Sequence, residues 1–491
     1  MTITDTAGRG LADLEQRVAE DLAKVAYPSG RWVTPHRTHD GSRVLDVLIV
    51  GGGQGGTAIA HALTRQRVLN YRIVDQSDAG LEGPWNTYAR MATLRSPKAV
   101  TGPDLDIPCL TFQAWFEAQH GAAAWEDLNK IDKGDWVAYL LWLRRVLGLN
   151  VENGKRLERI EPADPYLVAT VRDLASDRVE RISARKIVLA TGIESSGRWW
   201  TPPVVEALDK RYWAHTSEEI DFAALKGKRV AVLGAGASAF DNAATALEAG
   251  VGSVTLCVRR PELQRVQPFR WLSFPGFLGH FHTLDDSWRW RFMNYLLSLR
   301  EAFPRETWQR VARHGNFDMR TGAGWEAVAP AGDCVRVSTP GGDLEADFLI
   351  VGTGFDMDLG LRPELDGVGE HVARWSDRYA PPAGEDNLRL GRYPYLGPAY
   401  ELLEREPGTA PWLRHIRLFT FGATMSFGPS GASINAMKFA VPRLADGIVR
   451  DLFQEDVQDH WENLIGFQLP EFLFDGEEGE AAPAVPVIDR G

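Results

Sequence analysis

The sequence has few cysteines, and no two of them are close enough to pair locally. Only three occur in 491 residues, Cys109, Cys257 and Cys334, and they are far apart. Because there is no CxxC pair, the chain encodes neither a local zinc cluster nor a redox-active dithiol. A chain of this length buries a sizeable core without a disulfide. These features predict a protein of the reducing cytoplasm.

Long apolar runs and an excess of positive charge are also missing. No stretch reaches the length of a membrane span, and the acidic N-terminal segment lacks the apolar core of a signal peptide. The net charge is −12, whereas nucleic acids and anionic membranes attract basic surfaces. We therefore expect a soluble protein that acts on a small molecule, with neither nucleic acid nor membrane as a partner. The sequence leaves open whether the protein forms a homo-oligomer.

The chain does contain a duplicated unit of strand, glycine turn, helix and strand. The unit occurs at residues 43–76 and again at 227–261, and each copy has a Val/Ile/Leu run typical of a strand buried in a parallel sheet. Two further strands, at 184–196 and 346–358, end in "ATG" and "GTG" turns and bracket the second unit. This order predicts an α/β fold with two Rossmann-like dinucleotide-binding domains, the second inserted into the first.

The same order predicts domain boundaries. A helical N-terminal extension is expected at 1–43, where apolar residues recur at helical spacing and would pack on the main body or on a second subunit. The first domain is predicted at 44–195 and 340–470, and the second at 196–339. An aromatic-rich helical insertion is expected at about 262–326, and an acidic mobile tail at 471–491. The insertion's aromatic residues line a substrate channel or form a core or subunit interface: Trp271, Phe274, Phe277, Phe281, Trp288 and Trp290.

The first glycine loop has the pattern of a dinucleotide site. Gly51, Gly53 and Gly56 satisfy G-x-G-x-x-G between a strand and a helix. Gly51 permits the tight turn, Gly53 lets the backbone approach a pyrophosphate, and Gly56 lets the helix pack on the strand. Asp75 ends the next strand, where a carboxylate accepts hydrogen bonds from a ribose diol. An adenosine with a free ribose, as in FAD, is the expected ligand.

The second loop carries opposite charge at the corresponding strand end. Gly234 and Gly236 are followed by Ala239 at the third glycine position, which the motif tolerates. Arg259 and Arg260 stand where the acid would be. Because guanidinium groups bind phosphate with bidentate geometry, this site is predicted to take NADPH. The alternative is a pair of solvated arginines at a strand end.

These motifs together resemble the class B flavoprotein monooxygenases, which include flavin-containing, Baeyer–Villiger and N-hydroxylating enzymes. The resemblance covers about residues 44–450 and rests on both glycine loops, "GLEGPW", the "ATG" and "GTG" turns, "GAGASAFD" with Ser238 and Asp241, and "GPSG" at 428–431. It implies that NADPH reduces FAD, that oxygen adds at flavin C4a, and that the resulting (hydro)peroxyflavin oxidises a small organic substrate by Baeyer–Villiger or N/S-oxygenation. The flavin would carry that chemistry.

The resemblance also implies site residues. Trp85 and Asn86 are expected beside the flavin, and "GPSG" is expected at a helix N-terminus that faces the reduced flavin. The candidate catalytic residues are Arg95, Asn86 and Trp85, and no metal ligand is predicted. The candidate cofactor-binding residues are Gly51, Gly53, Gln54, Gly56, Asp75, Gln76, Trp85, Gly234, Gly236, Ser238, Ala239, Arg259, Arg260, Thr191, Gly192, Thr353, Gly354, Gly428, Ser430 and Gly431.

The chain departs from the family pattern at a few positions. Asp209 and Arg211 replace the Phe and Gly expected before His215, and only one glycine precedes Trp85. His215 is expected to be structural rather than a proton carrier. Arg95 stands near the place of an active-site Asn, where a cation would favour the deprotonated, nucleophilic peroxide. The alternative is that Arg95 pairs with an acid or a cofactor phosphate.

Two other functions share the cofactor signals. An NADPH oxidase or flavin reductase that releases hydrogen peroxide would differ only in lacking oxygen transfer to a substrate. A non-catalytic nucleotide-binding redox sensor would also retain both glycine loops. A disulfide reductase is disfavoured, because it needs a dithiol that the chain lacks.

Overall fold

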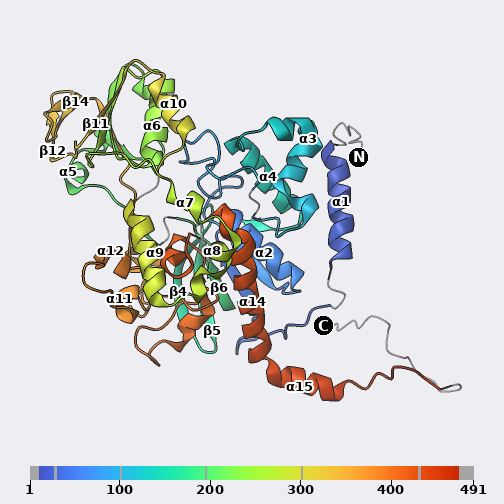
Figure 1. The fold of residues 1–491 in the computed structure, drawn as a ribbon. Coiled ribbons are helices and arrows are strands. Elements are labelled where there is room, and N and C mark those ends of the chain that lie inside the picture. The colour runs from blue at the N-terminus through green and yellow to red at the C-terminus, as the bar shows by residue number, and fades with distance from the viewer. Residues whose placement is uncertain are drawn as a thin grey trace.

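The computed structural model describes residues 10–26, 30–99, 102–193, 196–299, 302–429 and 433–474. Two sheet-based units are apparent in the ribbon, one of them in the upper left of Figure 1 around α6, β11 and α10. A third group of helices, α1, α3 and α4, lies beside the first unit. Each sheet-based unit has its own buried core.

Within the described residues the first sheet has seven strands in the order β3-β2-β1-β6-β5-β4, and β17 also pairs with β6. β1 lies parallel to β2 and β6, whereas β4, β5 and β6 form an antiparallel meander. β1 has five buried residues out of six, as expected for a parallel strand covered on both faces. Its strands are β1 (Leu45–Val50), β2 (Tyr71–Val74), β3 (Val151–Glu152), β4 (Lys155–Ala163), β5 (Tyr166–Asp173), β6 (Val179–Leu189) and β17 (Ile416–Leu418).

The second sheet is wholly parallel within the described residues. Its order is β11-β10-β9-β15-β8. The strands are β8 (Trp213–His215), β9 (Arg229–Leu233), β10 (Ser253–Val258), β11 (Phe317–Thr321) and β15 (Phe348–Val351). A small antiparallel sheet packs beside it and consists of β12 (Ala327–Ala331), β13 (Cys334–Ser338) and β14 (Leu344–Ala346). Each of the two larger sheets contains the two strands of one glycine unit, β1 and β2 in the first sheet and β9 and β10 in the second.

Two predicted boundaries need correction. β15 pairs with β9, so the second unit extends at least to Val351, beyond the predicted boundary at 340. The chain crosses between the units through β7 (Gly197–Trp199) and β16 (Phe355–Met357), which pair antiparallel. The predicted helical insertion likewise ends too late, because 317–321 is the outer strand β11. Strand pairing across long sequence separations decided both boundaries, and local composition does not report it.

The helices cover the sheets and form the third group. The α-helices within the described residues are α1 (Gly10–Lys24), α2 (Gln54–Arg65), α3 (Phe112–Asp127), α4 (Lys133–Val146), α5 (Pro203–Glu206), α6 (Ala237–Glu248), α7 (Pro268–Trp271), α8 (Pro275–His280), α9 (Asp286–Leu299), α10 (Arg305–Ala312), α11 (Trp375–Arg378), α12 (Leu388–Gly391), α13 (Thr424–Phe427), α14 (Met437–Glu455) and α15 (Val457–Gly466). α2 and α6 are the helices that follow the glycine loops. No helix within the described ranges is both long and apolar enough to cross a bilayer.

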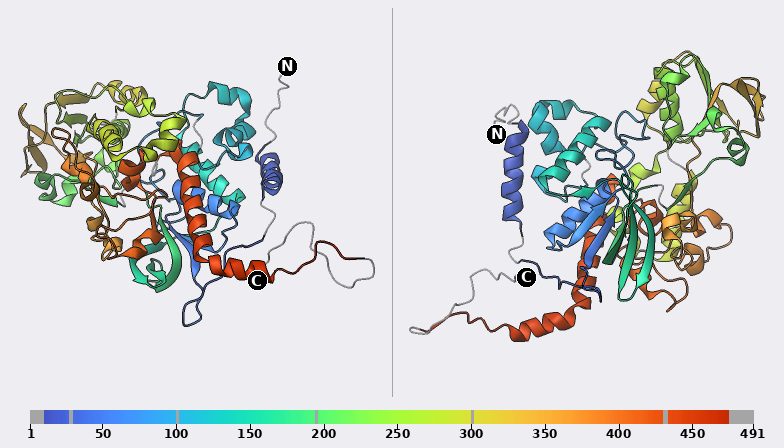
Figure 2. Two further views of the ribbon diagram at one scale, coloured as in Figure 1. Left: turned by 60° about the horizontal axis from the view of Figure 1, so that its bottom comes forward. Right: turned by 180° about the vertical axis from the view of Figure 1, so that it is seen from behind.

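α1 packs on the body of the molecule. Leu14 and Val18 are buried in the aromatic core of α3 and α4, and Glu15 pairs with Arg145 of α4 at 2.5 Å. Of the two alternatives for the N-terminal helix, the structure thus shows packing on the main body. α15, in contrast, has no buried residue and projects from the body in both views of Figure 2. Only residues 471–474 of the predicted tail are described.

Candidate functional site: two glycine loops and the segment between them

The first glycine loop joins β1 to α2 and has three different steric environments. A Cβ at Gly51 would lie 2.4 Å from the Ala190 carbonyl oxygen, and one at Gly56 would lie 1.8 Å from the Gly51 carbonyl oxygen. These two glycines are therefore required by the packing of the protein itself. Gly53 is different, because the closest atom to its Cβ would be 4.0 Å away. The space over Gly53 suits a ligand that approaches the backbone closely.

The N-terminus of α2 leaves its amide groups available to an anion. Gly53 is the N-cap, no side chain caps this end, and no acidic residue stands in the first turn. The N-termini of α3 and α4 are instead capped by the side chains of Thr111 and Asp132. Unsatisfied N–H groups at a helix start, together with the helix dipole, form a phosphate site. The loop thus has the donors and the open space that a pyrophosphate requires.

Asp75 lies at the end of β2, directly beside this loop. Its carboxylate accepts a hydrogen bond from the Gly52 amide and another from the Ser77 amide, both at 2.7 Å. These contacts fix the side chain, and an ionised carboxylate retains further lone pairs for a ribose diol. Gln76 is exposed next to it. The structure therefore brings Asp75 to the glycine loop, as the motif predicts.

The second loop repeats this design with one substitution. Gly234 has a φ of +147° and would place a Cβ 2.4 Å from the Gly352 carbonyl oxygen. Gly236 caps α6, and a Cβ there would meet no atom within 4 Å. The methyl group of Ala239 fills the position of the third glycine and is buried. Ser238 is exposed in the first turn of α6, and no side chain caps that end. This loop also offers open space beside free amides.

The "ATG" and "GTG" turns lie against the two loops in corresponding ways. The Ala190 amide donates to the Val50 carbonyl at 2.8 Å, and the Gly352 amide donates to the Leu233 carbonyl at 2.7 Å. Thr191 and Gly192 follow in the first turn, and Gly192 has a φ of +85°. In the second turn, the Thr353 hydroxyl donates to the Trp200 carbonyl, and Gly354 has a φ of +82°. Each turn forms one wall of the loop beside it.

The two arginines after β10 have different surroundings. The Arg260 guanidinium donates to the carbonyls of Ser298 and Leu299, each at 3.0 Å, at the C-terminus of α9. Arg259 is exposed, its stem lies against Gly324, and within the described residues its guanidinium donates no hydrogen bond. Arg259 is thus free to contact a ligand at the end of β10, whereas Arg260 holds the insertion. The sequence alone does not distinguish the roles of these two arginines.

The segment at 82–98 connects the first loop to the third group of helices. The Trp85 ring lies 6.5 Å from that of Trp136, whose indole N–H donates to Gln54 at the start of α2. Trp85 is therefore close to the first glycine loop. Asn86 is exposed and donates to the Gly80 carbonyl at 3.0 Å, so it stabilises its own loop. A flavin-side role for Trp85 and Asn86 stays a prediction.

Glu82, which the sequence did not single out, fixes this segment. Its carboxylate pairs with Arg144 of α4 at 2.6 Å and accepts from Asn153 at 2.7 Å. The sequence near Glu82 does not indicate this anchor, because both partners of Glu82 lie more than 60 residues away along the chain.

Arg95 links the two sheet-based units. Its guanidinium donates to the buried carboxylate of Asp241 in α6 at 3.3 Å. Asp241 also accepts from Thr307 at 3.1 Å and from Arg310 at 3.3 Å, both in α10. Beside this cluster is a small hollow of about 20 Å³, room for about one water molecule, between residues 91–95 and 304–310. The structure thus matches the interpretation in which Arg95 pairs with an acid.

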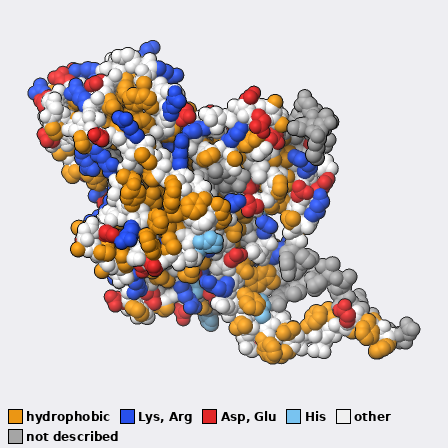
Figure 3. Space-filling model, viewed as in Figure 1, with side chains coloured by type: hydrophobic (Ala, Val, Ile, Leu, Met, Phe, Trp, Pro, Cys, Tyr) orange, Lys and Arg blue, Asp and Glu red, His pale blue; other side chains and the backbone are white. Residues whose placement is uncertain are grey.

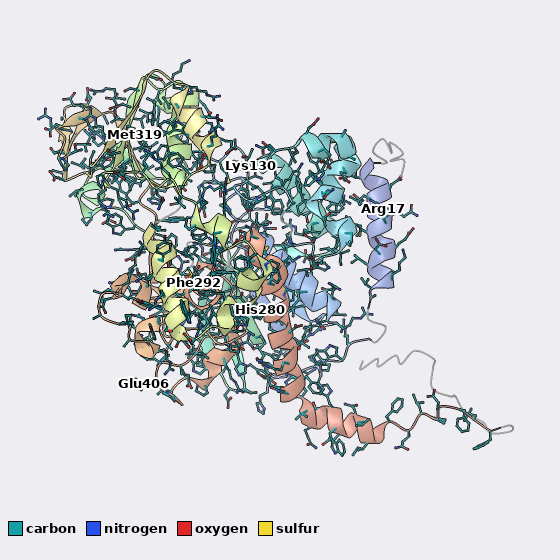
Figure 4. The ribbon with its side chains drawn as sticks, in the orientation of Figure 1. Arg17, Lys130, His280, Phe292, Met319 and Glu406 are labelled. Carbon is teal, nitrogen blue, oxygen red and sulfur yellow. The ribbon has the colours of Figure 1, made fainter. Side chains whose placement is uncertain are left out.

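Further contacts hold the same junction. Arg90 donates to the Glu218 carbonyl at 3.0 Å, and Arg310 donates to the Arg90 carbonyl at 3.0 Å. Lys130, labelled in Figure 4 between the α3–α4 helices and the second unit, pairs with Glu306 at 3.3 Å. The 82–98 segment is therefore a contact surface for the second unit as well as a neighbour of the first loop.

The "GPSG" motif lies in the sequence between the short helix α13 and the long helix α14. Gly428, with a φ of +72°, ends the short helix α13 and packs against Phe277 and Phe281 of the insertion. The long helix α14 begins only at Met437, after a 3-10 turn at Ile434–Ala436. Ser430 and Gly431 lie outside the described residues. Helical structure in the described residues thus begins at Ile434, within the "ASINAM" stretch that follows the motif, and a helix start facing the flavin stays a prediction.

The aromatic residues of the insertion divide into two groups. Phe277, Phe281 and Trp290 are buried in a core shared with residues 357–436. Trp271, Phe274 and Trp288 are exposed. The structure therefore supports a core role for the first group and leaves the second group on the surface.

His215 is the last residue of β8, at the crossing between the units. Its ring is buried, lies 5.2 Å from that of Trp199 in β7, and shares a 2.7 Å hydrogen bond with the Ser217 hydroxyl. Burial lowers the pKa of His215 from 6.5 to about 4, although the nearby Glu218 opposes this effect. A neutral, buried imidazole agrees with the predicted structural role.

We expect this imidazole to make the protein sensitive to acid. Between pH 6.5 and 4 the unfolded chain binds a proton at His215 and the folded protein does not. The free energy of unfolding therefore decreases as the pH is lowered from 6.5 to 4. The difference reaches about 3 kcal/mol at the lower end. His215→Asn should lose this part of the pH dependence in denaturant unfolding. The exposed His39→Asn should follow the wild-type curve, and identical curves for all three proteins would contradict the assignment.

Known proteins place this architecture in a class. Residues 45–270 match the family model "Pyridine nucleotide-disulphide oxidoreductase". The structure is similar to that of ornithine hydroxylase from Pseudomonas aeruginosa, with a TM-score of 0.65 at 17% identity over 83% of this chain and 100% of that one. It is also similar to ornithine N-hydroxylase from Kutzneria sp. 744, solved with reduced FAD, NADP+ and L-ornithine, with a TM-score of 0.64 at 17% identity over 83% and 99% of the chains. These likenesses show the fold, and the predicted fold class is confirmed.

The chain belongs to the class B flavoprotein monooxygenases, and it is an oxidoreductase. A relative in Xanthomonas campestris pv. campestris, described as "FAD-dependent urate hydroxylase", is 43% identical over 465 residues, which are 94% of this chain and 97% of that protein. The "FAD-containing monooxygenase EthA" of Mycolicibacterium smegmatis is 24% identical over 67% of this chain and 73% of its own. The three cysteines of the present chain are buried and unpaired.

Proposed function

We propose that this protein is a urate hydroxylase, which uses NADPH and O2 to insert one oxygen atom into urate or a closely related oxidised purine. The observation that carries the proposal is the 43% identity to a urate hydroxylase across nearly the full length of both chains. The balanced reaction consumes substrate, NADPH, a proton and O2, and yields hydroxylated substrate, NADP+ and water. This proposal is narrower than the Baeyer–Villiger or N/S-oxygenation that the family resemblance implies.

The residues of both loops suit the two cofactors. FAD, when bound, would supply the redox chemistry with oxygen. Gly53 and the uncapped start of α2 would hold its pyrophosphate, and Asp75 its ribose. Gly236 and the start of α6 would hold the pyrophosphate of NADPH, and Arg259 its 2′-phosphate. Thr191 and Gly192 beside the first loop, and Thr353 and Gly354 beside the second, would complete the proposed sites.

The test follows urate, NADPH and O2 in one reaction. Purified holoenzyme should consume equal amounts of all three, with urate loss read from its ultraviolet absorbance and O2 from an electrode. Catalase should return no oxygen, because a coupled hydroxylase releases little hydrogen peroxide. NADPH oxidation that is unaffected by urate, with peroxide as the product, would instead establish the oxidase. A parallel panel of ketones, amines and sulfides would detect the broader chemistries.

Arg95 offers a test of how the two units cooperate. Arg95→Ala should reduce kcat/KM for NADPH about three- to tenfold, because a partly buried ion pair of this kind contributes about 1 kcal/mol. Asp241→Asn weakens the same contact without removing the cation. If Arg95 acts by positioning α6, Asp241→Asn, which also weakens the contacts to Thr307 and Arg310, should cause at least the same loss, and both variants should release the same fraction of peroxide. Uncoupling confined to Arg95→Ala would instead support a direct effect of its charge on the flavin.

A further inference from the structure

The segment at 457–474 forms an arm whose large apolar side chains are mostly exposed within the described part of the chain. α15 carries apolar residues at positions i, i+4, i+7 and i+8, and residues after it are also apolar. Seven large side chains are between 49% and 64% exposed: Val457, Trp461, Leu464, Ile465, Phe467, Leu469 and Phe472. Figure 3 shows hydrophobic side chains along this projection. Monomeric proteins rarely leave so large a contiguous patch in water.

The base of the arm is fixed by buried ion pairs. Asp456, directly before α15, pairs with Arg185 of β6 at 2.8 Å, and both side chains are almost completely buried. His36 also contacts Asp456, at 2.9 Å, and Lys186 pairs with Glu455. Removing one partner of such a buried pair is costly, so the fold holds the direction of the arm. The arm is therefore presented to a partner rather than left to fold back.

A second exposed apolar surface lies on the insertion. Trp271, Phe274, Trp288, Phe292 and Tyr295 form this aromatic patch, in which neighbouring rings lie 5.5 to 6.2 Å apart. Trp288, Phe292 and Tyr295 follow one face of α9, and Trp271, Trp288 and Tyr295 are 62%, 46% and 65% exposed. Arg265 and Arg270 are exposed in the segment that leads to Trp271, and Arg291 lies over the Trp288 ring and pairs with Glu385 at 3.2 Å. Figure 3 shows apolar side chains over α8 and α9 on the same face as the arm.

The charges of the two surfaces are complementary. Between residues 457 and 474 the arm has Asp459, Glu462 and Glu471 but no Lys or Arg. An acidic arm is poorly suited to an anionic membrane and repels a second arm, but it suits an aromatic patch with a basic border. The exposed apolar area of one arm is about 800 Å², which is what one partner contributes to a standard interface. In a dimer with two reciprocal contacts, the two arms together contribute twice the apolar area of one arm.

We propose that the protein is a homodimer in which the arm of each copy covers the aromatic patch of the other. Because one chain carries both surfaces, a two-fold axis lets both contacts form and closes the assembly. The dimer is independent of the substrate proposal, since neither surface includes a glycine loop.

The first test is the oligomeric state of the full-length holoenzyme. Light scattering after size exclusion should give a dimer at micromolar concentration. Trp461→Glu with Leu464→Glu should raise the dimer dissociation constant at least 100-fold and give a monomer that retains its flavin. Leu388→Glu, at a side chain that is 90% exposed elsewhere, should remain a dimer. A monomeric wild type, or a dimeric arm variant, would overturn the proposal.

The second test identifies the contacting surfaces. Trp461→Cys and Trp271→Cys are prepared separately and treated with a short bis-maleimide, to which the three buried native cysteines should react little. A mixture of the two variants should yield a cross-linked dimer, and each variant alone should not. Cross-linking of Trp461→Cys alone would show that arms pair with each other and would refute the assigned patch.

Discussion

Arg259→Ala is expected to raise the KM for NADPH about 30-fold and to leave the KM for NADH nearly unchanged. The Arg259 guanidinium is exposed at the end of β10 and donates to no described residue, so its charge is available for a 2′-phosphate. Charge-assisted hydrogen bonds of this kind contribute about 2 kcal/mol, which corresponds to the stated change. Steady-state kinetics with both nucleotides measures the effect, and an unchanged preference for NADPH would contradict the assignment.

Arg260→Ala is the matched control for this prediction. Its guanidinium donates to two carbonyls at the end of α9. This helix belongs to the insertion, and its buried side chains pack in the core that the insertion shares with residues 357–436. Its loss should lower the free energy of unfolding by about 1 kcal/mol and leave the KM for NADPH within twofold of the wild type. A large KM effect in the Arg260 variant with none in the Arg259 variant would reverse the two roles.

Gly53→Ala should produce a folded protein that is purified largely without flavin. A methyl group there would meet no protein atom closer than 4.0 Å, but it would occupy the space that the pyrophosphate needs. We expect FAD to bind about 100-fold more weakly, or by about 3 kcal/mol. The change of N-cap residue by itself should cost no more than about 1 kcal/mol of stability. Flavin content and FAD titration of the apoprotein measure the result.

Gly55→Ala, two residues further on, separates the ligand effect from helix packing. A Cβ at Gly55 would face Phe419 at an ordinary contact distance of 3.4 Å, inside α2 and away from the loop opening. This variant should retain FAD with near-normal affinity. Equal flavin loss in both variants would point to the helix rather than to close approach at Gly53.

The sequence by itself determined the two dinucleotide units. The constraints at Gly51, Gly53 and Gly56 act between residues close in the chain, and buried parallel strands leave an obvious Val/Ile/Leu pattern. Asp75 was found for the same reason, because the ends of neighbouring strands β1 and β2 meet at one edge of the sheet. The class of enzyme was predicted from the family resemblance that these and the other short motifs carry.

Only the tertiary structure decided which side chains of each motif are available and what lies between the units. It assigned Arg260 to the end of α9 and left Arg259 exposed, it paired Arg95 with Asp241 across 146 residues, and it placed 348–351 in the second sheet. It also showed that the apolar residues of α15 are exposed within the described part of the chain. Side-chain direction and long-range pairing depend on how the whole chain packs, so no local pattern in the sequence could report them.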